Sequence, residues 1–126
     1  KMVNETRKIL DDETIAITAT CVRVPVFYSH SEAINLELKK EYEVNDIKEL
    51  LKNAPGIVVV DDTDNNKYPL ASVATGTDEV YVGRIRRDDS VKNGLNLWVV
   101  ADNIRKGAAS NAVQIAELLI KKGLVR

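Results

Sequence analysis

The sequence is poor in the residues on which several classes of protein depend. It has one cysteine, Cys21, so no internal disulfide can form, which is typical of a reducing compartment such as the cytoplasm. It has one histidine and no His/Cys cluster with the spacing of metal ligands, so we expect no metal site. None of its 6 glycines forms a GxGxxG phosphate loop. No apolar run approaches the ~20 residues of a membrane span, so no membrane partner is expected.

Neither sign of charge dominates the chain. There are 18 Lys and Arg against 19 Asp and Glu, which gives a net charge of −1. A non-specific nucleic-acid binder is normally basic, so nucleic acid is not an expected partner. Hydrophobic residues make up 44% of the 126 residues, which is ordinary for a globular domain or part of one. The first residue is Lys1 and no signal-peptide pattern follows, so we expect the chain to begin inside a longer protein.

Hydrophobic periodicity predicts a mixture of helices and strands in the order α-β-β-α-β-β-β-α. The predicted helices cover 2–10, 46–53 and 106–122, and the predicted strands cover 15–24, 33–40, 57–60, 79–87 and 95–102. Asn45 or Asp46 is a candidate helix cap, Asn93-Gly94 a hairpin turn, and Gly123 the end of the last helix. The polar stretch 61–78 is predicted to be a long loop.

Adjacent strands joined by short turns favour an α+β fold. We therefore expect a mostly antiparallel mixed sheet with helices on one face. The second face then needs a cover, and Tyr81 and Trp98 are candidates for an interface there. Two copies that pair through this sheet would each bury about 800 Å².

His30 is a candidate for acid–base chemistry. It lies between two predicted strands among small polar residues, where an imidazole can accept or donate a proton. A solvent-exposed loop histidine without a role explains the same position.

Arg23 is a candidate for binding an anion. By strand alternation it shares with Ile17 and Cys21 a face that looks buried, where its planar guanidinium needs a carboxylate or phosphate. A local salt bridge, or a strand that ends before Arg23, is the alternative. Cys21 lies in the middle of the same predicted strand, where a buried and inert thiol is expected. The chain therefore offers a base and an anion clamp but no good nucleophile.

The last predicted helix opens with Lys106-Gly107-Ala108-Ala109 after Asn103. The start of a helix with small residues can receive an anion or the polar edge of a ligand. Capping by Asn103 and close packing of the small residues explain the same pattern.

Several blocks of the sequence resemble aspartate-semialdehyde dehydrogenases. These blocks are KMVNETRKIL at 1–10, TCVRVPV at 20–26 with HSE at 30–32, VGRIR at 82–86, DNIRKGAA at 102–109 and NAVQIAE at 111–117. They cover essentially the whole chain in the order and spacing of the family. The RVPV and HSE blocks are specific, whereas N-acetyl-γ-glutamyl-phosphate reductases look similar at DNIRKGAA. The resemblance implies part of a C-terminal domain like that of glyceraldehyde-3-phosphate dehydrogenase.

The resemblance also implies an activity and a site. The family reduces β-aspartyl phosphate to aspartate semialdehyde with NADPH, which feeds lysine, methionine and threonine synthesis. A cysteine forms a thioester and a histidine moves the proton. Matching positions imply that His30 is the general acid/base and that Arg23 holds the substrate carboxylate. Lys1 would help to bind phosphate, and Asn103 would contact the nicotinamide carboxamide of NADP.

The resemblance places other parts of the enzyme upstream of Lys1. These parts are the glycine-rich nucleotide loop, the nucleophilic cysteine and a substrate-binding glutamine, so Cys21 is not the nucleophile. Residues 1–126 are then expected to be the C-terminal part of the catalytic and dimerisation domain, a homodimer inactive without the rest. Ser29 stands where the family commonly has glycine, which is expected to alter the local turn.

The final helix is a separate expectation. In the family it packs partly on the nucleotide domain, so residues after about Gly107 are expected to expose apolar surface or to be covered by a second copy. Two other functions stay open at this point. The chain could be a free-standing dimerisation or binding module of the same fold, or part of an N-acetyl-γ-glutamyl-phosphate reductase.

Overall fold

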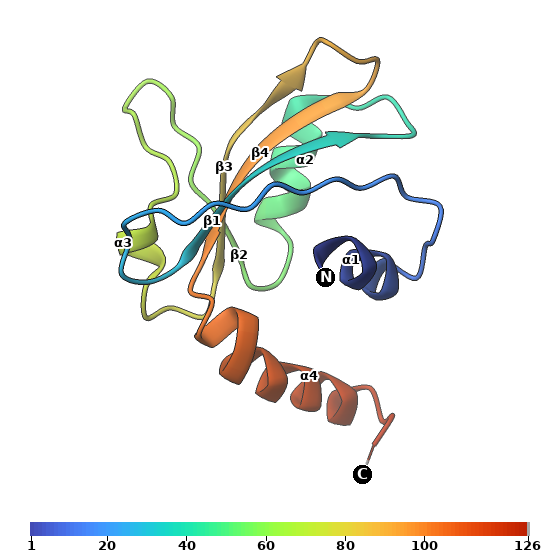
Figure 1. The fold of residues 1–126 in the computed structure, drawn as a ribbon, viewed down its shortest axis with the longest axis vertical. Helices are drawn as coiled ribbons and strands as arrows, with labels where there is room; N and C mark the ends of the chain where they lie inside the picture. Colours follow the sequence, from blue (N-terminus) through green and yellow to red (C-terminus); the bar gives the residue numbers. More distant parts are fainter. Residues whose placement is uncertain (126) are drawn as a thin grey trace.

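The computed structural model describes residues 1–125 and has a four-stranded sheet in the order β1-β4-β3-β2 (Figure 1). The strands are β1 (His30–Glu37), β2 (Ile57–Val59), β3 (Val80–Asp88) and β4 (Gly94–Ala101). The helices are α1 (Met2–Leu10), α2 (Val44–Lys52), α3 (Ala71–Ala74) and α4 (Ser110–Lys121), with a π-helical turn η1 (Arg105–Ala109) before α4. β4 is antiparallel to β1 and β3, and β2 is parallel to β3. The predicted α+β fold with a mostly antiparallel mixed sheet is confirmed.

The core lies between the sheet and α2. Val82, Ile85 and Leu95 are buried in it, and the α2 residues Ile47 and Leu51 pack against them. The spacing of Ile47 and Leu51 puts both on one face of the helix, which explains why α2 forms against the sheet. Full burial of a side chain of this kind contributes about 1.5–3 kcal/mol, and the partly buried Ile47 and Leu51 contribute less.

The segment 61–78 covers the opposite face of the sheet. It was predicted to be a loop, but it contains α3 and an isolated bridge between Asp62 and Lys67. Trp98 of β4 donates a 3.0 Å hydrogen bond from Nε1 to the carbonyl of Pro69. Ala74 of α3 and Val100 of β4 are fully buried. The second face therefore has a cover from the chain itself, at the end near α3.

The predicted strand over 15–24 is wrong. The segment is extended but belongs to no strand, and the edges of the sheet are β1 and β2. Isoleucine, threonine and valine favour β structure, but a strand also needs a partner for its backbone N–H and C=O groups. No such partner exists within residues 1–125. Strand alternation consequently says nothing about Arg23 and Cys21, and both are exposed.

Several boundaries differ from prediction, and three of them concern a candidate residue or a predicted cap or turn. β1 begins at His30, so this histidine starts a strand instead of lying in a loop. α2 begins after Glu43 without a side-chain cap, so Asn45 and Asp46 lie in its first turn. The connection between β3 and β4 is residues 89–93, and Gly94 already belongs to β4. The Asn-Gly signal located the hairpin correctly but not its turn.

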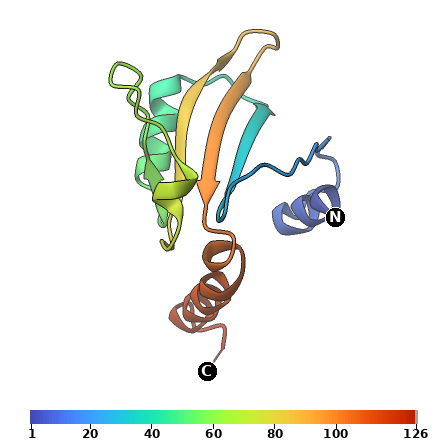
Figure 2. The ribbon, with the colours of Figure 1, turned by 60° about the vertical axis from the view of Figure 1, so that its left-hand side comes forward.

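The C-terminal helix projects away from the sheet (Figures 1 and 2). It ends at Lys121, and Gly123 follows the C-cap Lys122 as predicted; its φ of 67° is left-handed and its N–H bonds the carbonyl of Ile120. Its exposed apolar side chains are Val113, Ile115, Leu118 and Ile120. The expectation of exposed apolar surface after Gly107 is confirmed. Within residues 1–125, every helix is too short or too polar to cross a membrane.

Candidate active site

The sheet brings two distant motif blocks together at one end. His30, at the start of β1, pairs with Ala101, at the end of β4. The chain leaves β4 directly through Asp102 and Asn103. His30 is therefore next to the Asp-Asn pair across the ladder, although the two blocks are far apart in sequence. His30 is exposed and Asn103 is partly buried.

Asp102 organises this end of the sheet. Its side chain is buried, and its Oδ1 accepts hydrogen bonds from the backbone N–H groups of Ile104 at 2.9 Å and Arg105 at 3.3 Å. Its Oδ2 accepts a 2.8 Å bond from the N–H of Gly76. The Gly76 bond is the main reason that the pKa of Asp102 is lowered.

The contacts of Asp102 bear on whether Asn103 caps the helix or is available for a ligand. The helix start is capped by Asp102, so the predicted capping role of Asn103 is wrong. The amide of Asn103 has no hydrogen-bond partner in the described part of the chain. It is free to bind the polar edge of a ligand.

An ion pair between Arg105 and Asp78 fixes the base of the last helix. Arg105 binds Asp78 through two hydrogen bonds, Nε to Oδ1 at 2.8 Å and Nη2 to Oδ2 at 3.0 Å. The Arg105 guanidinium and then the Ser110 hydroxyl lower the pKa of Asp78 to about 2. Lys106 instead donates to Oε1 of Gln114 at 2.7 Å, about two turns further along the same helical segment. Loop 75–78 and the helix base therefore hold each other in place.

Ser29 precedes His30 in a conformation that favours glycine. Its φ is 73°, and its buried side chain shares a 2.9 Å hydrogen bond with the hydroxyl of Thr75. The glycine-like backbone is therefore present although the residue is serine.

Sequence reasoning missed Thr75, Gly76, Asp78 and Asp102 as parts of this region. Only Asp102 carried a recognisable signal, because an aspartate just before a helix is a typical N-cap. The others become visible through contacts between segments that are distant in sequence.

Lys1 and Arg23 do not join His30 and Asn103 in this structure. Lys1 precedes α1, which lies to one side of the sheet (Figure 2), and its Nζ is 3.9 Å from Oε1 of Glu5. Arg23 is exposed and contacts no carboxylate within residues 1–125, so the buried position predicted for it is wrong, while its role in binding an anion stays a prediction. Cys21 was expected to be buried, but it is exposed and its Sγ lies 3.3 Å from Sδ of Met2.

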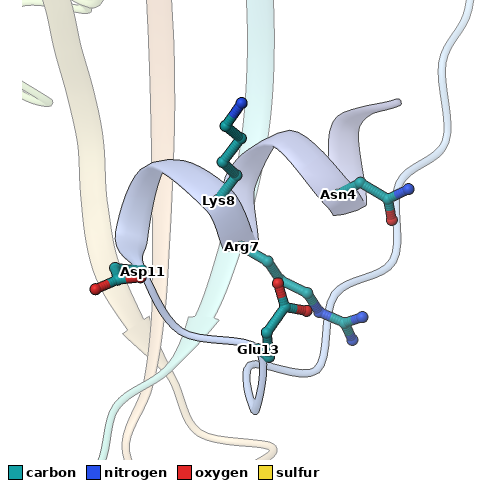
Figure 3. A pocket seen from close by; sticks show the side chains of 5 residues that line it. All are labelled: Asn4, Arg7, Lys8, Asp11 and Glu13. Carbon is teal, nitrogen blue, oxygen red and sulfur yellow. The ribbon is translucent and has the colours of Figure 1, made fainter.

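One hollow in the described residues lies away from this site. It has a volume of about 590 Å³ and lies beside α1 (Figure 3). Asn4, Arg7, Lys8, Asp11 and Glu13 line it, and Lys8 points away from Arg7 and Glu13. None of the candidate residues contributes to it. In residues 1–125 no group of three or more His, Cys, Asp or Glu is placed to hold a metal ion.

The chain is similar in sequence to several proteins that carry the same name. The chain is 61% identical over 125 residues to an aspartate-semialdehyde dehydrogenase of Aquifex aeolicus, covering 99% of this chain and 37% of the relative. It is 58% identical to one of Legionella pneumophila, covering 100% and 37%. The chain thus spans little more than a third of the length of these relatives.

The solved structures that resemble this chain belong to enzymes of the same name as its sequence relatives. A Vibrio cholerae aspartate semialdehyde dehydrogenase II complexed with ASA superposes with a TM-score of 0.88 at 48% identity, covering 95% of this chain and 35% of that one. A Candida albicans enzyme with NADP gives a TM-score of 0.62 at 28% identity, covering 82% and 33%. Residues 1–106 match the family model described as semialdehyde dehydrogenase, dimerisation domain. The chain belongs to this dimerisation-domain family, and its relatives there are aspartate-semialdehyde dehydrogenases.

Proposed function

We propose that the chain is the C-terminal dimerisation and catalytic segment of an aspartate-semialdehyde dehydrogenase. The reaction is reductive dephosphorylation: β-aspartyl phosphate, NADPH and a proton give aspartate semialdehyde, NADP⁺ and phosphate. A cysteine outside residues 1–126 would form the thioester. The pairing of His30 with Ala101 carries the proposal, because it joins the HSE block to the Asp-Asn block at one place. The pathway would be lysine, methionine and threonine synthesis in the cytoplasm.

His30 is proposed as the general acid/base. A neutral imidazole carries one proton donor and one acceptor, so it can take the proton of a thiol and later return one to the reacting oxygen. His30 is exposed and its ring has no hydrogen-bond partner among residues 1–125, so it is accessible to a group from the rest of the protein.

Asn103 is proposed to contact the NADP nicotinamide. When bound, the dinucleotide supplies the hydride. An amide side chain fits a carboxamide because each has both a donor and an acceptor, and the amide of Asn103 is unengaged in the described part of the chain. Asp102 fixes the backbone that carries it. The relative complexed with NADP supports this cofactor.

Arg23 and Lys1 are proposed to bind the two anionic ends of the substrate. The guanidinium of Arg23 suits two-point binding of the aspartyl carboxylate, and the ammonium of Lys1 suits phosphate. Both side chains are exposed, and the 3.9 Å Lys1–Glu5 contact at the surface is weak enough to yield to a ligand. The relative complexed with ASA supports this substrate class.

A homodimer is proposed through the sheet. The family description names a dimerisation domain, and Tyr81 and Trp98 are only partly buried on the face that includes Gly83. Sedimentation velocity of the chain at micromolar concentration is expected to give a species of twice the chain mass. A monomer at that concentration would contradict the proposal.

The catalytic proposal is tested in a chimeric enzyme. This chain replaces the matching 125 residues of the Aquifex aeolicus relative, and NADPH oxidation with β-aspartyl phosphate is followed. His30→Ala is expected to lower kcat by about 10²–10⁴-fold, as loss of a general acid/base does. Ser31→Ala is the matched control, because this neighbour points to the other face of β1. A His30→Ala enzyme that is folded and keeps more than a tenth of the activity would refute the role of His30.

A further inference from the structure

The residue before His30 is held under backbone strain by its surroundings. The φ of Ser29 is 73°, in the left-handed region that non-glycine residues rarely adopt. Such a conformation persists only where surrounding contacts offset its cost. Ser29 is 4% exposed, so neighbouring residues cover it almost completely.

The hydrogen-bond geometry assigns a direction to the Ser29–Thr75 contact. The Thr75 hydroxyl donates to the carbonyl of Ala71 at 2.8 Å. A hydroxyl has one proton, so Thr75 cannot donate a second time and must accept at the 2.9 Å contact. Ser29 is therefore the donor. A glycine at this position would relieve the strain but could not make this bond.

This contact closes a ring of residues around the start of β1. Six residues form this closed circle of contacts, which we call the His30 contact circle: Ser29, His30, Ala101, Asp102, Gly76 and Thr75. Three of the links are covalent neighbours in sequence. The other three are the ladder pair His30–Ala101, the 2.8 Å bond from Gly76 N–H to Asp102, and the Ser29–Thr75 bond.

We propose that Ser29 and Thr75 are positioning residues that fix the His30 imidazole relative to Asp102 and Asn103. The proposal rests on the proposed function, because it deepens the role of His30. The ladder alone fixes one side of His30, since β1 starts there and no strand residue precedes it. The Ser29–Thr75 bond fixes the other side. Asp102 is buried and anchors Gly76, so the loop that receives the bond is itself held.

The test uses the chimeric enzyme with substitutions at both ends of the bond. Thr75→Val is expected to lower kcat about three- to tenfold with KM unchanged, the size of effect that the loss of one hydrogen bond produces. Thr75→Ser keeps the hydroxyl and is expected to stay within about twofold of the parent. Ser29→Gly removes the donor while relieving the strain, and it is expected to lower kcat like Thr75→Val.

Thr77→Val is the matched control. Thr77 lies in the same loop and donates to the carbonyl of Ala74 at 2.8 Å, just as Thr75 donates to the carbonyl of Ala71. Unlike Thr75, it does not belong to the His30 contact circle. Its substitution should leave kcat unchanged. A purely structural role for Thr75 would lower the melting temperature of both threonine variants and leave kcat of the folded enzyme unaltered in both.

A second readout separates this proposal from the role of His30 in catalysis. With ¹³C-labelled histidine, the His30 imidazole resonance is assigned by its loss in His30→Ala. Thr75→Val and Ser29→Gly should each move or broaden that resonance, whereas Thr77→Val should not. An unmoved resonance, or a Ser29→Gly enzyme with the parent kcat, overturns the positioning proposal. A fully active His30→Ala enzyme overturns only the proposed function, because the resonance still reports the position of the ring.

Discussion

Gly83→Ala should break the contact between β3 and the segment that covers the second face. A Cβ atom at Gly83 would lie 2.0 Å from the carbonyl oxygen of Val60 and 2.6 Å from Cδ of Pro69. Real Cβ contacts begin above 3 Å, so the backbone at Val60 must retreat by more than an ångström. This movement strains the bond from Val60 N–H to the carbonyl of Val82, which is 2.8 Å long.

The expected loss of stability combines the cost of the Cβ clash with the cost of the weakened Val60–Val82 hydrogen bond. Overpacking costs about 1–3 kcal/mol and a weakened backbone hydrogen bond about 0.5–1.5 kcal/mol. We expect the free energy of unfolding to fall by about 2–4 kcal/mol on Gly83→Ala. The assay is urea unfolding followed by fluorescence of Trp98, the one tryptophan of the chain, which pairs with Gly83 across the ladder.

Gly107→Ala is the control for the glycine substitution itself. A Cβ there meets only Cβ of Asn103 at 3.8 Å, which is ordinary contact. Alanine also favours a helix, so stability should stay the same or rise by up to about 1 kcal/mol. Equal unfolding midpoints for Gly83→Ala and the parent chain would refute the packing argument.

Two further predictions concern the packing of Leu95 in the core and the pH dependence of the Asp78 contact at the base of the last helix. Leu95→Ala should lower the free energy of unfolding by about 2–5 kcal/mol in the same urea assay, because Leu95 is 2% exposed in the core; a change below 1 kcal/mol would contradict its place there. The pKa of Asp78 is lowered from 3.8 to about 2, so its contribution to stability is complete above pH 3.8 and is lost as pH falls through about 2. Hydrogen exchange of residues 104–110 should accelerate across that window in the parent chain but not in Asp78→Asn, and identical acid profiles would contradict this.

Local signals were sufficient where an element depends on its own residues. The helix Met2–Leu10 forms with the predicted bounds, and Gly123 ends the last helix because only a left-handed residue fits there. The hairpin of β3 and β4 was also correctly located. These elements need only neighbouring residues or a short turn to form.

Signals failed where a feature depends on a distant partner. The 15–24 segment has the composition of a strand but lacks a partner within the described residues, so the buried face assigned to Arg23 and Cys21 does not exist here. The sequence could not reveal that Ser29 meets Thr75, since these residues are joined only through tertiary structure. His30 could be named as a candidate because its residue type alone suggests proton transfer, whereas its contacts with Ala101 and, through Ser29, with Thr75 could not be predicted from the sequence.

α4 is held at its N-terminal base, so a movement of its far end is transmitted to that base. Its 12 residues extend about 18 Å from a base that Arg105 and Asp102 fasten to the loop of Gly76 and Asp78. Because Thr75 precedes Gly76 and bonds Ser29, a force on the far end of α4 is linked to the backbone of His30 through the Arg105–Asp78, Asp102–Gly76 and Ser29–Thr75 contacts. A body that rests on the exposed apolar residues of α4 would therefore change the orientation of the imidazole without touching it.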